Sequence, residues 1–236
     1  GSFIYGVSDG FANNSPVFNR GRHQEPSEEH IPRRFLSALP LGDIPFKSKG
    51  SGRLELAEAM LNEENPLTSR VMVNRIWHHL FGRGIVETVD NFGLQGKLPS
   101  HPKLLDHLAI KFQKDGWSIK KIIKYILTSE AFKRSTKIDE ATSAKDPNNI
   151  YLASFPIRRS ESEAIRDGIL VASGDFNPAV YGPPVPTYLT KFMQGRGRPE
   201  KSGPLNGDGR RSIYQEVRRN FLEPLMTTFD RPIPFT

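Results

Sequence analysis

The sequence predicts a mainly α protein, a helical domain with a small antiparallel β-hairpin and a long irregular N-terminal arm. Three observations lead to this class. Segments between residues 53 and 129 repeat apolar side chains at intervals of three and four, as amphipathic helices do. Residues 211–219 alternate apolar and polar side chains, as a strand does. Residues 1–50 are rich in proline and glycine and show no helical period.

The arm, residues 1–50, has too little apolar surface to fold alone, so we expect it to pack on the helical body. Short strands are expected near Phe3–Val7 and Val17–Arg20. Residues 51–236 are expected to form a mainly helical domain that folds as a single unit. Because the chain stops soon after a short helix at Phe221–Thr228, we expect a fragment truncated at its C-terminus.

Arg53–Leu61 is the first expected helix. Leu54, Ala57 and Leu61 recur at the spacing of a core-facing stripe, so this helix is expected to bury one face.

The best-delimited helix follows Asn65, which can cap it. Pro66 suits the first helical position because its missing N–H would be unpaired there, and Gly82 supplies the left-handed residue that ends a helix. One arc is apolar and consists of Met72, Val73, Ile76, Trp77, Leu80 and Phe81. The opposite arc is polar and consists of Arg70, Asn74, Arg75, His78 and His79. This polar arc is either a hydrogen-bonded structural feature or part of a site.

Two more helices are expected at residues 100–112 and 119–129, the first opened by Ser100-His101-Pro102 and the second capped near Ser118. Their core-facing residues are Leu104, Leu105, Leu108, Ala109 and Phe112, and Ile119, Ile122, Ile123, Ile126 and Leu127. Short loops between these helices predict an antiparallel helical unit.

The last third of the chain begins with Lys137–Asn149, which is polar and is expected to be a surface loop. A helix is expected at Ser160–Ala172, with a capping box of Ser160 and Glu163 and with Gly174 at its end. The strand predicted at Arg211–Arg219 is expected to pair with Tyr188–Met193 as the hairpin.

The composition is basic, with 33 Lys and Arg against 26 Asp and Glu and a formal charge of +7. This charge permits an acidic partner such as an anionic glycan. Nucleic acid is not the expected partner, because the basic residues are mixed with acids along the chain. The absence of cysteine excludes disulfides, thiolate metal sites and cysteine catalysis. No apolar run approaches the roughly 18 residues that span a bilayer.

The histidines do not have the spacing of a helical metal site. His78 and His79 are adjacent and point about 100° apart, and His101 and His107 are six residues apart, whereas helical ligand pairs are four apart. We therefore expect no metal and no cofactor. His78 is open to two interpretations, a hydrogen-bonded structural histidine or a general base.

Glu163, Arg166 and Asp167 share one face of the helix expected at residues 160–172. They form either a structural ion network or a site in which two carboxylates divide the acid and base roles. Arg70 and Arg75 need counter-charges if the polar arc is covered, and these carboxylates are the expected partners.

The loop Gly207–Ser212 can bind an anion through backbone N–H groups and the guanidiniums of Arg210 and Arg211. The alternative is a flexible loop in which these arginines pair with Asp208 or Glu216. Binding candidates are therefore Arg70, Asn74, Arg75, Arg166, Arg210 and Arg211, and catalytic candidates are His78, Glu163 and Asp167.

An ordered set of sequence blocks spans most of residues 50–230. The blocks are Asn65–Val86 with Asp90–Gly93, Ser100–Pro102 with Leu104–Asp106, Arg158–Arg159 with Glu163–Asp167, and Gly203–Leu205 with Asp208–Tyr214. The set resembles the C-terminal domain of unknown function 1553 of planctomycete-type exported, cytochrome-c-linked multidomain proteins. The resemblance implies export to the periplasm or cell surface and an association with sulfated-polysaccharide degradation, with no established reaction. Lys103 departs from the family, which tends to have a glutamate there, and the family's C-terminal helical tail is missing.

Two functions follow from the residues and the resemblance. The first is a non-catalytic interaction or scaffold domain whose partner is an anionic, sulfated glycan or a neighbouring domain of the same polypeptide. The second is an enzyme acting on polysaccharide with carboxylates near the Arg70/Asn74/His78 helix face. A pocket holding Glu163 or Asp167 within about 10 Å of a second carboxylate favours the enzyme. A fully paired network favours the scaffold.

Overall fold

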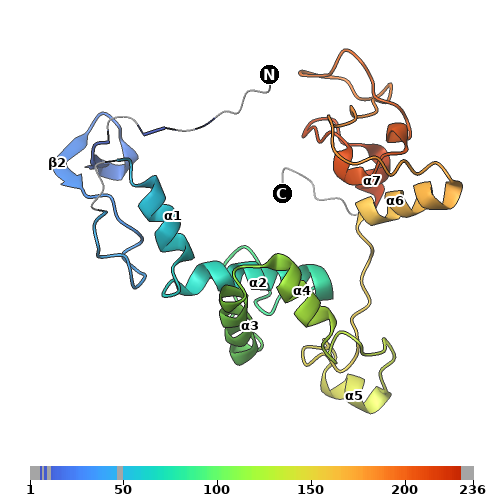
Figure 1. Cartoon of the computed structure of the whole chain (residues 1–236), viewed down its shortest axis with the longest axis horizontal. Helices are drawn as coiled ribbons and strands as arrows, with labels where there is room; N and C mark the ends of the chain where they lie inside the picture. Colours follow the sequence, from blue (N-terminus) through green and yellow to red (C-terminus); the bar gives the residue numbers. More distant parts are fainter. Residues whose placement is uncertain (1–5, 7, 10–11, 47–49, 230–236) are drawn as a thin grey trace. The chain divides into compact units, whose positions relative to one another are not determined.

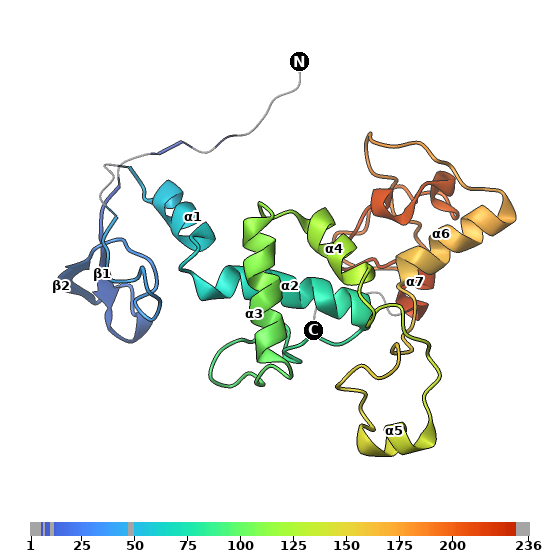
Figure 2. The ribbon, with the colours of Figure 1, turned by 60° about the horizontal axis from the view of Figure 1, so that its bottom comes forward.

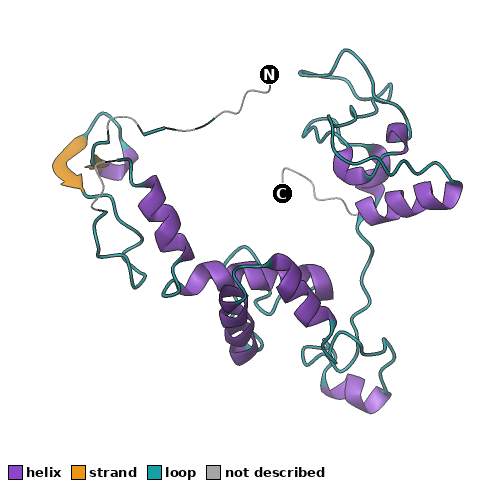
Figure 3. Cartoon of the chain, in the orientation of Figure 1, coloured by secondary structure: helices purple, strands orange, loops and turns teal. Residues whose placement is uncertain are grey.

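The computed structural model describes residues 6, 8–9, 12–46 and 50–229. In this part of the chain the structure is mainly helical with one two-stranded antiparallel sheet, which confirms the predicted fold class (Figures 1 and 3). The strand expected near Phe3–Val7 lies, except for Gly6, outside the described residues. No described helix is long and apolar enough to cross a membrane.

The chain divides into two compact units, unit 1 of residues 1–157 and unit 2 of residues 158–236. This division differs from the boundary at residue 50 that the sequence suggested. The folding of residues 51–236 as a single unit stays a prediction.

The hairpin of the fold lies in the N-terminal arm. Strand β1 (Ser15–Phe18) pairs antiparallel with β2 (Pro26–Ile31) through Ser15 with Ile31 and Phe18 with Pro26, and the 3₁₀ turn η1 (Asn19–Gly21) follows β1. β1 overlaps the strand expected near Val17–Arg20. The arm is therefore less irregular than its prolines suggested, because Pro26 stands at a strand end, where no ladder N–H is needed.

Helix α1 (Arg53–Leu61) has the predicted bounds but not the predicted packing. None of its residues is buried, and Leu54 and Leu61 are 69% and 54% exposed. The expectation of a core-facing stripe was wrong here, since spacing alone does not supply a partner surface.

Helix α2 (Pro66–Phe81) confirms the predicted signals. The Asn65 side chain accepts a hydrogen bond from the Leu67 N–H, and Gly82 closes the helix at φ 81°. Its apolar arc enters the core of unit 1 except at Met72, which is 37% exposed. Trp77 and Phe81 stack with ring centroids 4.2 Å apart.

Helices α3 (Pro102–Lys114) and α4 (Ile119–Leu127) complete the core of unit 1. Figures 1 and 2 both show α3 running across α2, and α3 and α4 are in contact. Ser118 caps α4 as expected, accepting from the Lys121 N–H. The buried core residues are Val73, Ile76, Trp77, Phe81, Ile85, Val86, Leu105, Leu108, Phe112, Ile122 and Ile126.

A short helix, α5 (Glu140–Lys145), interrupts the loop expected at Lys137–Asn149. Asp139 caps its N-terminus, because the carboxylate accepts hydrogen bonds from the backbone N–H and the hydroxyl of Thr142. The expectation of a loop was wrong for residues 140–145, which form this helix.

Unit 2 contains helix α6 (Ser162–Ser173), the 3₁₀ turns η2 (Gly207–Gly209) and η3 (Ser212–Tyr214), and helix α7 (Pro224–Thr228). α6 begins two residues later than predicted, with Glu161 at the N-cap position. Ser160 lies outside that position, so the predicted capping box is wrong. Gly174 ends α6 as expected, at φ 82°.

The strand predicted at Arg211–Arg219 is wrong. This segment begins with η3 and then forms isolated bridges, a parallel one between Val185 and Gln215 among them. The alternation of side chains was present in the sequence, but Tyr188–Met193 does not provide the ladder that a strand needs in the described structure.

Candidate functional site

The arginines of the α2 polar arc have counter-charges within unit 1. Arg70 Nε donates to Asp106 Oδ1 at 2.7 Å, and Arg70 Nη1 donates to the carbonyl oxygen of Pro66 at 2.8 Å. Arg75 Nη2 lies 3.1 Å from Asp90 Oδ1. We expected acids of the 160–172 helix as partners, and the structure supplies Asp106 and Asp90.

Asn74 lies on the same arc but is fully buried. Its Nδ2 donates to the carbonyl oxygen of Val86, and its Oδ1 accepts from the Val86 N–H, both at 2.9 Å. A side chain at Gly84 would approach this amide to 2.8 Å, so the glycine lets the chain pass close to α2. Asn74 thus fastens the segment after α2 to the helix.

His78 is half-buried, and its Nδ1 is buried without a hydrogen-bond partner among the residues that the structure describes. Desolvation by burial lowers the pKa of the imidazole, the neighbouring His79 acts in the same direction, and Asp90 opposes them. A histidine with these surroundings stays neutral at neutral pH and keeps a lone pair.

The centre of unit 2 is Arg166, which is 7% exposed. Its Nη2 donates to the carbonyl oxygen of Asn206 at 2.6 Å, and its Nη1 donates to the carbonyl oxygen of Arg210 at 2.8 Å and to Ser212 Oγ at 3.2 Å. Burial lowers the pKa of this guanidinium, and the carboxylates of Asp167 and Glu223 act against that shift. Arg166 therefore holds the loop 206–212 from inside.

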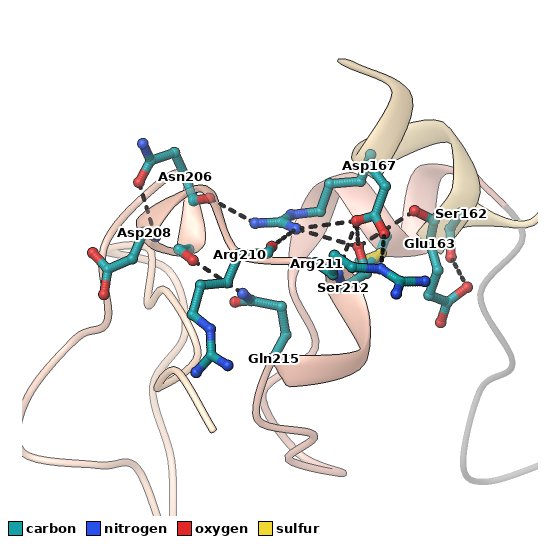
Figure 4. A network of polar contacts seen from close by, with 12 residues as sticks. Ser162, Glu163, Asp167, Asn206, Asp208, Arg210, Arg211, Ser212 and Gln215 are labelled. Atoms are coloured by element: carbon teal, nitrogen blue, oxygen red, sulfur yellow. Dashed lines mark hydrogen bonds and ion pairs between the residues drawn. The ribbon is translucent and has the colours of Figure 1, made fainter. Parts of the chain in front are cut away.

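Asp167 holds the same loop from the other side, as Figure 4 shows. Its Oδ1 accepts from the backbone N–H of Ser212 at 2.8 Å and from Ser212 Oγ at 2.7 Å. Arg211 Nε lies 3.8 Å from Asp167 Oδ2. Glu163 Oε2 accepts from Ser162 Oγ at 2.9 Å. The network thus gathers three predicted site residues, Arg166, Asp167 and Arg211, and the first two bind backbone groups of the loop.

The two neighbouring arginines of the loop have different environments. Arg210 donates to the carbonyl oxygens of Tyr181 at 2.6 Å and Pro183 at 3.1 Å, and its guanidinium lies 4.1 Å from the centroid of the Tyr214 ring. We considered Asp208 or Glu216 as internal partners, and the structure provides carbonyls and an aromatic ring. The Arg211 side chain is 53% exposed.

A cleft of about 540 Å³ lies on unit 2 beside the network. Arg166, Asp175, Tyr188 and Glu223 are among its lining residues, and Glu163 and Asp167 are not. The two carboxylates that the sequence proposed as an acid and base pair thus lie outside this cleft. No group of three or more histidine and carboxylate side chains in the described ranges is arranged to hold a metal ion.

Sequence reasoning missed Ser212, Asn206 and the acids Asp90 and Asp106. Gly207 is the signal that could have found the first two, because a Cβ at this position would collide with Arg166 Nη2 and the Gln215 amide. Because glycine has no side chain, the loop backbone at this position can lie directly against the Arg166 guanidinium. The acids have no local signal, since Asp90 lies 15 residues from Arg75 and Asp106 lies 36 residues from Arg70.

Comparison with family models gives one finding. The model described as PSD1, a protein of unknown function (DUF1553), matches residues 52–236. Neither the curated proteins nor the solved structures contain a match to this chain.

Proposed function

This chain belongs to the PSD1 family of proteins of unknown function (DUF1553), and we propose that it is a non-catalytic interaction or scaffold module of an exported multidomain protein. The proposed partner is an anionic, sulfated glycan or a neighbouring domain of the same polypeptide. Export and the link to polysaccharide utilisation in planctomycete-type proteins rest on the resemblance of the sequence blocks at residues 65–214.

The observation that carries the proposal is the use of Asp167. Both hydrogen bonds to its Oδ1 come from Ser212, and Arg211 faces its other oxygen. A general acid or nucleophile must reach its substrate, whereas this carboxylate is committed to a loop. The same holds for Arg166 and Asn74, whose polar groups bind backbone.

Arg211 supports the choice of an anionic partner. Arg211 lies in the loop 206–212 with a half-exposed side chain, and the whole chain carries a formal charge of +7. Its neighbour Asp167 is also neutralised in part by Arg166, whose Nη1 lies 3.6 Å from Asp167 Oδ1. Exposed guanidiniums bind sulfate and carboxylate groups through paired hydrogen bonds. Such contacts weaken as salt screens them over about 8 Å at physiological ionic strength.

The test uses sulfated and unsulfated oligosaccharides of matched length. Isothermal titration at low and high salt measures binding, and chromatography of the same mixtures after long incubation measures cleavage. We expect binding that needs sulfate, weakens with salt and leaves the oligosaccharide intact. The non-catalytic proposal would be refuted if the parent protein cleaves the oligosaccharide and the Asp167→Asn variant, with an unchanged melting temperature, does not.

One observation favours the rival function, an enzyme acting on polysaccharide. His78 is half-buried on the polar arc of α2, and burial lowers the pKa of its imidazole, which leaves the ring in the neutral state that a general base requires. Two carboxylates, Asp106 and Asp90, pair with Arg70 and Arg75 of the same polar arc. Loss of oligosaccharide cleavage in His78→Gln with retained binding would support this second function, and no cleavage by the parent protein would dismiss it.

A further inference from the structure

Unit 1 carries a groove of about 440 Å³ that the proposed function does not use. This volume lies in the range of small-molecule sites. Its apolar lining comes from Trp77, Leu104, Leu108, Ile126 and Leu152. The polar and aromatic side chains that also line the groove are His101, His107, Tyr125, Thr128, Ser129, Arg134 and Tyr151. The groove thus combines an apolar interior with aromatic and basic side chains.

One wall of the groove is a turn held in an unusual conformation. The Asp146 carboxylate accepts from the N–H groups of Ile150 at 2.9 Å and Tyr151 at 2.8 Å, and Asn149 Nδ2 donates to the carbonyl oxygen of Ser154 at 2.8 Å. Leu152 has φ 52°, which a branched side chain adopts at a cost. Tyr151 in this turn is 74% exposed. A strained turn that presents an exposed aromatic ring indicates a prepared contact surface.

The aromatic rings of the groove are fixed by neighbours. The His101 ring meets the Tyr151 ring edge-on, with centroids 5.7 Å apart. His107 Nε2 lies 3.1 Å from the Tyr125 hydroxyl oxygen, and Lys111 Nζ lies 4.7 Å from the Tyr125 ring centroid. Fixed rings lose little conformational entropy when a flat molecule packs against them.

The charge of the groove has one sign. Arg134 is exposed and donates from Nη1 to the carbonyl oxygen of Ala153 at 3.1 Å, a neutral partner that leaves its charge in place. The lining contains two histidines besides and no aspartate or glutamate. A cationic ligand would find no counter-charge among these residues, whereas an anion would find a guanidinium.

We propose that this groove binds a small organic anion with a flat apolar body, an aromatic carboxylate. The body lies against Tyr151 and Tyr125 over the apolar lining, and the carboxylate faces Arg134. The proposal goes beyond the proposed function and does not depend on it, because the groove lies in unit 1 and shares no residue with the Arg211 loop of unit 2. A neutral sugar does not fit as well, since the lining offers more apolar than hydrogen-bonding surface.

The test compares three probes that share one ring system and differ in charge, namely 2-naphthoate, 2-naphthamide and 2-naphthylmethylammonium. Titration is followed by intrinsic fluorescence and by NMR of the full chain. We expect 2-naphthoate to bind at least tenfold more tightly than 2-naphthamide, as charge-assisted contacts require, and the ammonium probe to bind most weakly. Equal affinity for the three probes overturns the proposal.

Variants locate the site. Arg134→Ala should remove the preference for the anion, Arg134→Lys should retain most of it, and Tyr151→Ala should weaken both 2-naphthoate and 2-naphthamide about tenfold. Arg22→Ala and Phe192→Ala are matched controls at exposed residues outside the groove lining and should change nothing. Unchanged binding in Arg134→Ala or Tyr151→Ala overturns the proposal.

The outcomes separate this site from the proposed function. If 2-naphthoate does not bind but sulfated oligosaccharide binds without being cleaved, the groove proposal is rejected and the proposed interaction function stands. Cleavage of oligosaccharide with binding of 2-naphthoate rejects the non-catalytic module and keeps the groove. A neutral oligosaccharide that displaces 2-naphthoate at equal concentration reassigns the groove to sugars and overturns the anion assignment.

Discussion

Replacing Arg166 by methionine tests the role given to the network of unit 2. Methionine keeps the apolar stem but has no donor. The carbonyl oxygens of Asn206 and Arg210 lose donors at 2.6 and 2.8 Å, whereas Ser212 Oγ keeps Asp167 as a partner. An acceptor left without its bond costs about 1–3 kcal/mol, so the two carbonyls together set a range of about 2–6 kcal/mol.

Two effects place the expected loss in the lower half of that range. Asn206 is exposed and Arg210 is partly exposed, so water can replace some of the lost bonding. The variant also no longer buries a charge, which offsets part of the loss. We expect the free energy of unfolding to fall by about 3 kcal/mol. At roughly 2–4 °C per kcal/mol for a chain of this size, the melting temperature should fall by about 6–12 °C.

The assay is a thermal melt by circular dichroism together with limited tryptic digestion. Trypsin should cut after Arg210 and Arg211 faster in Arg166→Met than in the parent, because the loop is no longer held. Arg219→Met removes the same charge at an exposed position and serves as the control. A melt and a cleavage pattern of Arg166→Met equal to those of the control would show that Arg166 does not hold the loop.

The remaining predictions concern four side chains. Trp77→Ala should cost about 3–5 kcal/mol in a denaturant melt because it empties the core beside Phe81, and a parent-like midpoint would contradict this. Asn74→Ala should cost about 2–4 kcal/mol by leaving the N–H and the carbonyl of buried Val86 unpaired. Asn74→Asp should cost at least as much, because it places a buried carboxyl oxygen against the Val86 carbonyl oxygen, and melts of both variants test this. The pKa of His78 is lowered from 6.5, so the folded state binds fewer protons than the unfolded state; stability is full above pH 6.5 and falls as the pH drops through the folded-state value. Melts at pH 7.5 and 5.5 should therefore differ more for the parent than for His78→Gln. Arg211→Ala should weaken binding of sulfated oligosaccharide at unchanged melting temperature, and titration that matches the parent would exclude this arginine from the anion contact.

The sequence was informative where the cause of a structure is local. Asn65, Pro66 and Gly82 set the ends of α2 through a side-chain cap, a missing N–H and a left-handed residue, and all three act within a few positions of the chain. Ser118 at the start of α4 and Gly174 at the end of α6 are local signals of the same kind. The helical spacing of the apolar residues between these ends also predicted that Trp77 and Phe81 lie in the core, where the structure has them.

The errors have a common cause. The N-cap predicted at Ser160 is displaced by one residue to Glu161, since a serine and a glutamate three apart do not compel a helix to start there. The stripe of α1 is exposed and the alternation at Arg211–Arg219 is not a strand, because each pattern needs a surface or a ladder partner that its own segment does not contain.

The candidate site shows the same division. By itself the sequence determined that Glu163, Arg166 and Asp167 share one helix face, since positions three and four apart are neighbours on any helix. Only the tertiary structure decided that Arg166 and Asp167 form hydrogen bonds with Ser212, some 45 residues away. Only the tertiary structure likewise decided that Tyr151 and Arg134 line one groove. A contact between distant segments depends on how the whole chain excludes water and pairs its polar groups, and no local period encodes that.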